Sequence, residues 1–263
     1  MATIAVSNHT FFVRERGEGP VALFVHGFPL DSTMWLEQID RLSDVRRCIA
    51  PDLRGFGHSA PSLRPALTME DHADDLVSLV DALDVEQIDL VGFSMGGYVA
   101  LAFAERYPDR LRTVALVDTK STEDAQATKE GRDAAAIRVA ADGRSGLATD
   151  MLGVLVAETA SVWTRARLRS MIEAVPAESV VAALEGMKVR PDRSAVLSNL
   201  SMPVAVIVGE HDALSPLSDA DHMAAAAGAA LTVAPNAGHM TPIENPAAVE
   251  AALRSLWGEI RSG

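Results

Sequence analysis

Residues 92–96 read Gly-Phe-Ser-Met-Gly, and this stretch decides how the rest of the chain is interpreted. It matches Gly-x-Ser-x-Gly, the pattern of a tight turn that leads from the end of a strand through a nucleophilic serine into a helix. The flanking sequence has the required character, because residues 87–91 form a short apolar run and residues 98–106 have helical composition before Pro108. The sequence therefore predicts a strand, a turn with Ser94 at its tip, and a helix.

Two glycines flank Ser94, each two residues away. The serine of such a turn has a strained backbone, at a cost of about 1–3 kcal/mol. Gly92 and Gly96 have no side chains, so the strand and the helix can approach each other closely. The start of the helix also offers unpaired N–H groups and the positive end of its dipole. These features suit a site where negative charge develops on an oxygen atom.

Composition limits the classes of protein to consider. The chain has 263 residues, of which 48% are hydrophobic, enough for one substantial core or two modest ones. A formal net charge of -13 argues against nucleic acid or an anionic membrane as a partner. The single cysteine, Cys48, offers neither a disulfide nor a zinc cluster, and we expect it to be buried. Without a recognisable signal peptide or a long apolar run, the expectation is a soluble cytoplasmic protein.

Strands and helices are predicted to alternate along most of the chain. Buried strands are expected at residues 21–25, 48–50, 88–91, 113–117, 204–208 and 230–233. Helical periodicity follows several of them, as in residues 69–83, whose apolar side chains share one face. This alternation predicts an α/β fold with a mostly parallel sheet and helices on both faces.

Residues 121–200 break this alternation, because they contain no predicted strand. They consist of helical pieces rich in Ala, Glu, Arg and Met, with expected boundaries near Gly143, Gly153, Ser161 and Pro176. We expect a helical insertion between two strands of the sheet. The chain then divides into a core (residues 1–120), the insertion (121–200) and the remainder of the core (201–263).

Ser94 needs a base, and His239 is the best placed of the seven histidines. It lies in a turn-rich loop after the last predicted strand and before a helix predicted over residues 246–260. Loops that follow parallel strands gather at one edge of the sheet, where ligands bind, and Ser94 and His239 both occupy such loops. Among the other histidines, His72 and His222 are expected to be solvated on helices, and His26 to brace its loop. His9, His58 and His211 have no assigned role.

A carboxylate should orient the imidazole and stabilise its cation. Asp212 follows the strand predicted at residues 204–208 and lies between Ser94 and His239 in the chain, which gives the order serine, acid, histidine. Asp118 also ends a strand and is the second candidate, with Glu210 behind it. For Asp118, the favoured interpretation is a helix cap or a loop anchor.

Two backbone N–H groups must face the carbonyl oxygen as it becomes an anion. Met95, the residue after the serine, is expected to provide one of them at the start of the helix. The loop after the strand at residues 21–25 is expected to provide the other. Phe28 is the natural donor in this loop, because Gly27 allows a sharp bend and Pro29 has no N–H group.

Five segments together resemble one known family. They are residues 26–29 (His-Gly-Phe-Pro), 52–59 (Asp-Leu-Arg-Gly-Phe-Gly-His-Ser), 92–97, 209–212 and 237–239 (Ala-Gly-His). In this order they resemble the α/β-hydrolases over nearly the whole chain. The resemblance implies an α/β-hydrolase fold in which residues 121–200 form a helical cap domain. It also implies that residues 52–59 form a structural turn near the site, to which we assign no catalytic role.

Within that family, the chain is similar to small carboxylesterases, 3-oxoadipate enol-lactonases and cofactor-free haloperoxidase-type perhydrolases. The resemblance implies a serine hydrolase that cleaves a small ester or lactone through an acyl-enzyme on Ser94, with no organic cofactor and no metal. Perhydrolysis and a non-catalytic small-molecule receptor remain as alternatives. Haloalkane dehalogenases and soluble epoxide hydrolases use aspartate where this chain has Ser94. The C–C bond hydrolases usually have a glycine-rich oxyanion segment, unlike Phe28-Pro29.

The insertion should set the choice of substrate. Its large apolar side chains are candidates to line a pocket, although most are expected to pack its helices together: Met151, Leu152, Leu155, Met171, Ile172, Leu184 and Met187. Five arginines could meet an anionic substrate, although a solvated helix face is the favoured interpretation: Arg138, Arg144, Arg165, Arg167 and Arg169.

Overall fold

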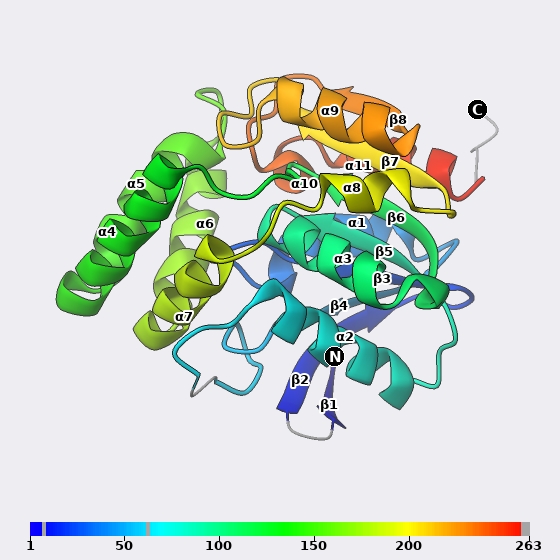
Figure 1. Ribbon diagram of the computed structural model, residues 1–263, viewed down its shortest axis with the longest axis horizontal. Coiled ribbons are helices and arrows are strands. Elements are labelled where there is room, and N and C mark those ends of the chain that lie inside the picture. The colour runs from blue at the N-terminus through cyan, green and yellow to red at the C-terminus, as the bar shows by residue number, and fades with distance from the viewer. Residues whose placement is uncertain (7–8, 62–63, 259–263) are drawn as a thin grey trace.

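An eight-stranded sheet forms the centre of the molecule (Figure 1). The computed structural model describes residues 1–6, 9–61 and 64–258. The strands lie in the order β1-β2-β4-β3-β5-β6-β7-β8, and those from β4 across to β8 are parallel. Their bounds are β1 (Ala2–Val6), β2 (His9–Arg16), β3 (Val21–Val25), β4 (Arg47–Pro51), β5 (Ile88–Phe93), β6 (Leu111–Val117), β7 (Val204–Gly209) and β8 (Ala230–Ala234). The predicted α/β fold and its mostly parallel sheet are therefore confirmed.

The two N-terminal strands were not predicted from the sequence. β1 pairs antiparallel with β2, and β2 pairs antiparallel with β4. β1 is at the edge of the sheet and largely exposed, and β2 alternates buried with half-buried residues. Neither strand therefore has the continuous burial of the central parallel strands β3, β5 and β7.

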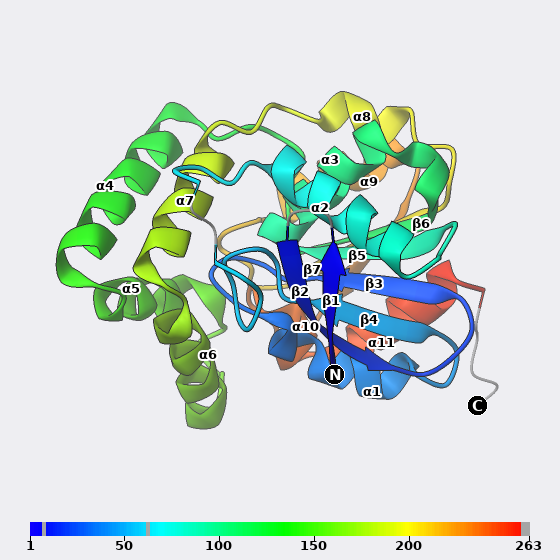
Figure 2. The ribbon, with the colours of Figure 1, turned by 90° about the horizontal axis from the view of Figure 1, so that it is seen from below.

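Helices cover both faces of the sheet (Figure 2). One face is covered by α2 (Met69–Ala82), α3 (Met95–Arg106), α8 (Ser194–Ser198) and α9 (Leu217–Ala227). The other is covered by α1 (Leu36–Leu42), α10 (Thr241–Glu244) and α11 (Pro246–Leu256). Two short 3-10 turns, at Ser32–Trp35 and Pro108–Arg110, complete the core. The predicted end of the last helix, Ile260, lies outside the described residues. Cys48 is fully buried in β4, as expected.

The helix predicted over residues 69–83 corresponds to α2. Thr68 begins it with a reciprocal capping box, in which Thr68 and Asp71 each accept from the other's backbone N–H group. The prediction that His72 is solvated is wrong, because its side chain is fully buried. His72 lies on the apolar face of α2 with Met69, Ala73 and Leu76. His222, by contrast, is exposed on α9.

Four helices between β6 and β7 lie beyond the end of the sheet in both views (Figures 1 and 2). These insertion helices are α4 (Gln126–Asp142), α5 (Ser145–Leu155), α6 (Val162–Ala174) and α7 (Ala177–Lys188). The boundaries expected near Gly143, Ser161 and Pro176 coincide with the gaps between them. The boundary expected near Gly153 corresponds to the end of α5 at Leu155, two residues later. The division into core and cap domains stays a prediction.

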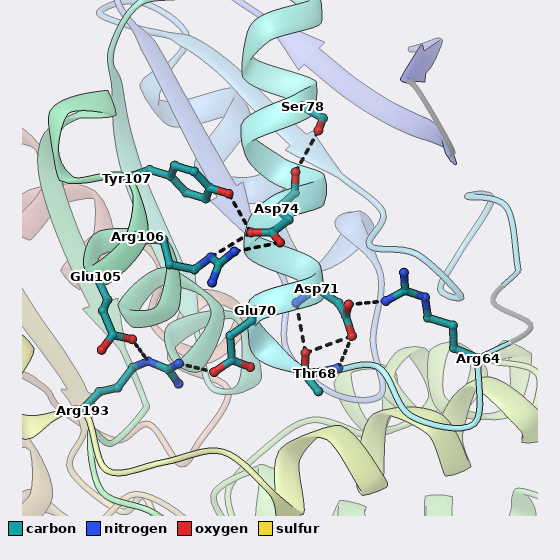
Figure 3. A network of polar contacts seen from close by, with 10 residues as sticks. All are labelled: Arg64, Thr68, Glu70, Asp71, Asp74, Ser78, Glu105, Arg106, Tyr107 and Arg193. Carbon is teal, nitrogen blue, oxygen red and sulfur yellow. Dashed lines mark hydrogen bonds and ion pairs between the residues drawn. The ribbon is translucent and has the colours of Figure 1, made fainter.

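A polar network joins the chain that leaves the insertion helices to α2 and α3 (Figure 3). The buried Arg193 guanidinium pairs with Glu70 of α2 and, at 3.0 Å, with Glu105 of α3. Farther along α2, Asp74 accepts a hydrogen bond of 2.7 Å from the Tyr107 hydroxyl. These contacts fix α2 against α3, the helix that begins directly after Ser94.

Candidate active site

Ser94 lies in the turn between β5 and α3, the arrangement that residues 92–96 predict. Its φ of 52° is in the left-handed region, which is unfavourable for a residue with a side chain. Neighbouring backbone holds it there: the Ser94 N–H donates to the Val117 carbonyl at 2.9 Å, and the Gly97 N–H donates to the Ser94 carbonyl at 2.8 Å. The turn therefore presents the Ser94 hydroxyl at the end of the sheet.

The two flanking glycines are required by close contacts. A Cβ at Gly92 would lie 2.3 Å from the Gly96 carbonyl oxygen, and one at Gly96 would lie 2.3 Å from the Val25 carbonyl oxygen. Both obstacles are backbone atoms, so they cannot move aside cheaply. Thr119, just after β6, supports the same turn, because its hydroxyl donates to the Ser94 carbonyl at 2.8 Å.

His239 and Asp212 form a hydrogen-bonded chain with Ser94. The distance from His239 Nε2 to Ser94 Oγ is 2.9 Å, and His239 Nδ1 lies 2.8 and 2.9 Å from the two carboxylate oxygens of Asp212. A carboxylate can only accept, so Nδ1 donates to Asp212, which leaves Nε2 to accept from the Ser94 hydroxyl. This is the tautomer that a general base requires.

The surroundings hold both partners of Ser94 in place. His239 follows β8, is only 2% exposed, and packs its ring against Phe93 with centroids 5.1 Å apart. Asp212 follows β7, and its Oδ1 atom also accepts from the backbone N–H groups of Leu214 at 2.8 Å and Ser215 at 2.9 Å. These donors satisfy the buried carboxylate and fix its orientation toward the imidazole.

The other candidate acids do not make this contact. Asp118 accepts from the Gly209 N–H at 2.8 Å and from the Thr241 hydroxyl at 2.7 Å, so it anchors the ends of β6 and β7 to the start of α10. Complete burial and the nearby charge of Asp212 raise the pKa of Asp118 well above its usual range. Glu210 is exposed and accepts from the Asn236 N–H at 2.9 Å.

Of the remaining histidines, His26 braces its loop as expected: its Nδ1 donates to the Gly27 carbonyl, and its Nε2 accepts from the Leu53 N–H, both at 2.9 Å. Burial lowers the pKa of His26. His58 and His211 are exposed, whereas His9 is buried.

Phe28 and Met95 adjoin Ser94 from two directions. Met95 is the first residue of α3, and Phe28 lies in the loop after β3. A Cβ at Gly27 would lie 3.1 Å from Ser94 Cβ, which shows how closely this loop approaches the serine. Within residues 1–6, 9–61 and 64–258, the amide groups of Phe28 and Met95 have no protein acceptor. Both are therefore available to a ligand.

A cavity of about 400 Å³ opens above Ser94 and His239. Its wall comes from the ends of the core strands and from the insertion helices. The lining residues are Phe28, Ser94, Tyr98, Lys120, Thr128, Gly131, Arg132, Ala135, Leu147, Met151, Leu184, Met187, Ala213, Leu214, Ser215 and His239.

Most of the apolar side chains singled out in the insertion pack in its core, as expected, and a minority line this cavity. Met151, Leu184 and Met187 face the cavity, as expected of a minority of the candidates. The other four, Leu152, Leu155, Met171 and Ile172, are buried in the hydrophobic core and are not among the described residues that line the cavity.

The five arginines singled out in the insertion are not among the lining residues of this cavity in the described part of the chain. They contact protein groups elsewhere: Arg138 pairs with Asp150 and Arg169 with Glu173, while Arg144, Arg165 and Arg167 donate to backbone carbonyls.

Sequence reasoning missed the two cations that do line the cavity, Lys120 and Arg132. Arg132 pairs with Asp124, which also accepts from Arg190 at 2.8 Å. The Arg190 guanidinium lies over the Tyr98 ring, 3.9 Å from its centroid. Burial alone would raise the pKa of Asp124, but hydrogen bonds and charges from Arg132 and Arg190 lower it. Lys120 lies in the loop after β6 and Arg132 lies on α4, and only the fold brings both to this cavity.

No helix within the described ranges is both long enough and apolar enough for a bilayer crossing. Within the same ranges, His, Cys, Asp and Glu side chains form no group of three that could hold a metal ion.

Comparison with known proteins is consistent with this geometry. The family model for the alpha/beta hydrolase fold matches residues 20–246. A thermophilic esterase from Thermogutta terrifontis, solved with malate bound, is 39% identical with a TM-score of 0.93 over 98% of both chains. The enol-lactonase from Burkholderia xenovorans LB400 is 26% identical with a TM-score of 0.90, over 98% of this chain and 100% of the other.

A curated relative is longer than this chain. The dihydrolipoyllysine-residue acetyltransferase component of an acetoin cleaving system from Pseudomonas putida is 34% identical over 237 residues, which are 87% of this chain and 61% of the relative. The matching family model and the full-length structural likeness lead to one conclusion: the chain belongs to the alpha/beta hydrolase fold family.

Proposed function

We propose that this protein is a serine hydrolase that cleaves a small carboxylic ester or lactone through an acyl-enzyme on Ser94. One observation carries the proposal: the chain of hydrogen bonds from Ser94 through His239 to Asp212, at 2.8 to 2.9 Å, at the base of a cavity of about 400 Å³. A serine is a weak nucleophile unless an adjacent base takes its proton, and this geometry supplies that base.

In the first half of the reaction, Ser94 Oγ attacks the substrate carbonyl carbon while His239 Nε2 takes the hydroxyl proton. The imidazolium that forms is stabilised by Asp212, which stays ionised. The tetrahedral intermediate then collapses, and His239 returns the proton to the departing alcohol oxygen. The acyl group remains bonded to Ser94.

The amide groups of Phe28 and Met95 are our proposed donors to the oxyanion. Their availability, the place of Met95 directly after Ser94 and the close approach of the Phe28 loop to Ser94 support this role. The helix dipole of α3 favours negative charge at the same point. Losing one such donor typically costs about 10²–10³ in rate.

In the second half, water takes the place of the alcohol. His239 removes a proton from the water as it attacks the acyl carbon, a second tetrahedral intermediate forms, and Ser94 leaves with the proton from His239. The carboxylic acid is released. With a lactone, the same steps open the ring, because the alcohol and the acid belong to one molecule.

The relatives support the substrate class. An esterase and an enol-lactonase, the two structures described above, share the fold over almost the whole chain. Both names describe cleavage of an acyl–oxygen bond, which is the reaction that an activated serine facing two amide donors performs.

The test is steady-state hydrolysis of 4-nitrophenyl esters from acetate to octanoate. Ser94→Ala should reduce kcat by at least about 10³-fold. The matched control is Ser78→Ala, since Ser78 lies on α2 and donates only to the Asp74 carbonyl. It should keep wild-type rates. Comparable activity in wild type and Ser94→Ala would overturn the proposal.

A further inference from the structure

Lys120 brings a positive charge into the wall of the Ser94 cavity without a partner among the described residues. It lies directly after Thr119, whose hydroxyl donates to the Ser94 carbonyl. Lys120 is therefore the neighbour of a residue that contacts the nucleophile turn. Its side chain is half-buried. Within residues 1–6, 9–61 and 64–258, no carboxylate pairs with the Lys120 ammonium and no acceptor hydrogen-bonds to it.

The other two lysines of the chain show what is usual in this protein. Lys129 pairs with Glu123 at 2.8 Å, and Lys188 pairs with Asp133 at 2.5 Å and with Glu185 at 2.6 Å. The chain has 36 acidic residues against 23 lysines and arginines, so carboxylates are abundant. An unpartnered lysine at the cavity is therefore not explained by a shortage of acidic side chains.

The rest of the wall does not compensate this charge. No Asp or Glu is among the described residues that line the cavity. Asp124, the partner of the lining residue Arg132, is shared by the guanidinium groups of Arg132 and Arg190. Asp212 is engaged by His239 and by two backbone N–H groups. The cavity is thus electropositive in a protein whose net charge is strongly negative.

From this arrangement we propose that the physiological substrate is an ester or lactone that carries a free carboxylate, and that Lys120 binds this carboxylate. The inference rests on the proposed hydrolase function and assigns its substrate class. A carboxylate matches a single ammonium, which acts as a point charge. The guanidinium fork of Arg132, which would suit a phosphate better, is already engaged by Asp124.

The apolar part of the wall agrees with such a ligand. Leu147, Met151, Leu184 and Met187 can cover a short hydrocarbon chain between the scissile carbonyl and the carboxylate. The resulting substrate is a half-ester of a dicarboxylic acid, a lactone acid, or an ester of a hydroxy acid. Charge-assisted contacts of this kind change affinity by about 10- to 100-fold.

The experiment compares substrates that differ in charge but not in shape. Mono-4-nitrophenyl glutarate and 4-nitrophenyl 5-methylhexanoate form one pair, in which an isopropyl group replaces the carboxylate. A second pair, 4-carboxyphenyl acetate and 4-isopropylphenyl acetate, has the carboxylate on the alcohol side. The enzymes are wild type, Lys120→Met, Lys120→Arg and, as control, Lys188→Met, whose native ammonium already has two carboxylate partners.

In at least one pair, wild type should prefer the anionic ester. Lys120→Met should lower the ratio of anionic to neutral kcat/KM by about 10- to 100-fold, mainly through KM. Lys120→Arg should restore most of that ratio, and Lys188→Met should leave it at the wild-type value. Melting temperatures of all variants identify any loss of folding. Such a loss lowers kcat/KM for the anionic and the neutral ester equally, so it leaves their ratio unchanged.

Two failures are distinguishable. If wild type cleaves the neutral esters and Lys120→Met changes the ratio in neither pair, the carboxylate site is refuted while the hydrolase function stands. If wild type cleaves none of the four esters and none of the 4-nitrophenyl alkanoates, the proposed function itself fails.

Discussion

His72 should make this protein sensitive to acid. Its imidazole is completely buried on the inner face of α2, and neither ring nitrogen has a hydrogen-bond partner among the described residues. Burial lowers the pKa of His72 to about 4, although the nearby Asp75 carboxylate acts in the opposite direction. The ring is therefore neutral in the folded protein at every pH where the protein is normally handled.

The size of the effect follows from the two protonation equilibria. In the unfolded chain the pKa is 6.5, so between pH 6.5 and about 4 the unfolded state binds a proton that the folded state does not. The contribution to stability is therefore complete above pH 6.5 and is lost as the pH falls. For a shift of this size, the loss between pH 7 and pH 5 amounts to about 2 kcal/mol.

The assay is urea unfolding of wild type and His72→Leu at pH 5, 6 and 7. The difference in the free energy of unfolding, wild type minus variant, should fall by about 2 kcal/mol from pH 7 to pH 5. The control is Ser78→Ala on the same helix, which removes no titratable group, so this difference should not depend on pH. A difference for His72→Leu that stays constant over this pH range would contradict the lowered pKa of His72 in the folded protein.

Further predictions concern the acid residues and the nucleophile turn. Asp212→Asn should lower kcat/KM for 4-nitrophenyl butyrate by about 10⁴-fold and Asp118→Asn by less than about tenfold, since only Asp212 contacts His239; the reverse order would move the acid role to Asp118. The pKa of Asp118 is raised in the folded state, so its contribution to stability is present at low pH and is lost as the pH rises through that pKa. The melting temperature of Asp118→Asn relative to wild type should therefore increase from pH 5 to pH 8. A difference in melting temperature that does not change with pH would contradict this assignment. Gly96→Ala should lower the free energy of unfolding by about 1–3 kcal/mol, because the added Cβ would meet the backbone of β3. Gly153→Ala, in open space on α5, should raise the free energy of unfolding by up to about 1 kcal/mol. Equal effects of the two substitutions in urea titrations would show that the turn is not tightly packed.

Much of the fold was predictable because the central parallel strands β3, β5 and β7 are buried on both faces and appear as continuous apolar runs. The edge strand β8 was predicted from its apolar residues although it is partly exposed. The N-terminal β1 and β2 were missed because their residues are partly exposed. His72 was misassigned although a signal was present: it is three residues after Met69 and four before Leu76, both on the buried face of α2. The surrounding acidic residues obscured that spacing.

The site was predictable where chain order and sheet topology determine position. Ser94, Asp212 and His239 follow β5, β7 and β8, and parallel strands bring such loops to one edge. Lys120 follows β6, so the same rule places it at that edge, but nothing in the sequence indicates that its ammonium faces the cavity. Arg132 lies on α4 and could not be placed in this way. Their contribution depends on how the insertion helices pack over that edge and on which carboxylates remain free, and both are properties of the tertiary structure.

The most direct test of the account is covalent labelling of the serine with a 4-nitrophenyl alkylphosphonate, which resembles the tetrahedral intermediate. Wild type should release 4-nitrophenolate in a burst of about one equivalent per chain and lose its activity, and mass spectrometry should find the phosphonyl group on Ser94. Ser94→Ala should show neither burst nor label. Labelling at another residue with loss of activity, or full activity after Ser94 is labelled, would contradict the claim that Ser94 is the nucleophile.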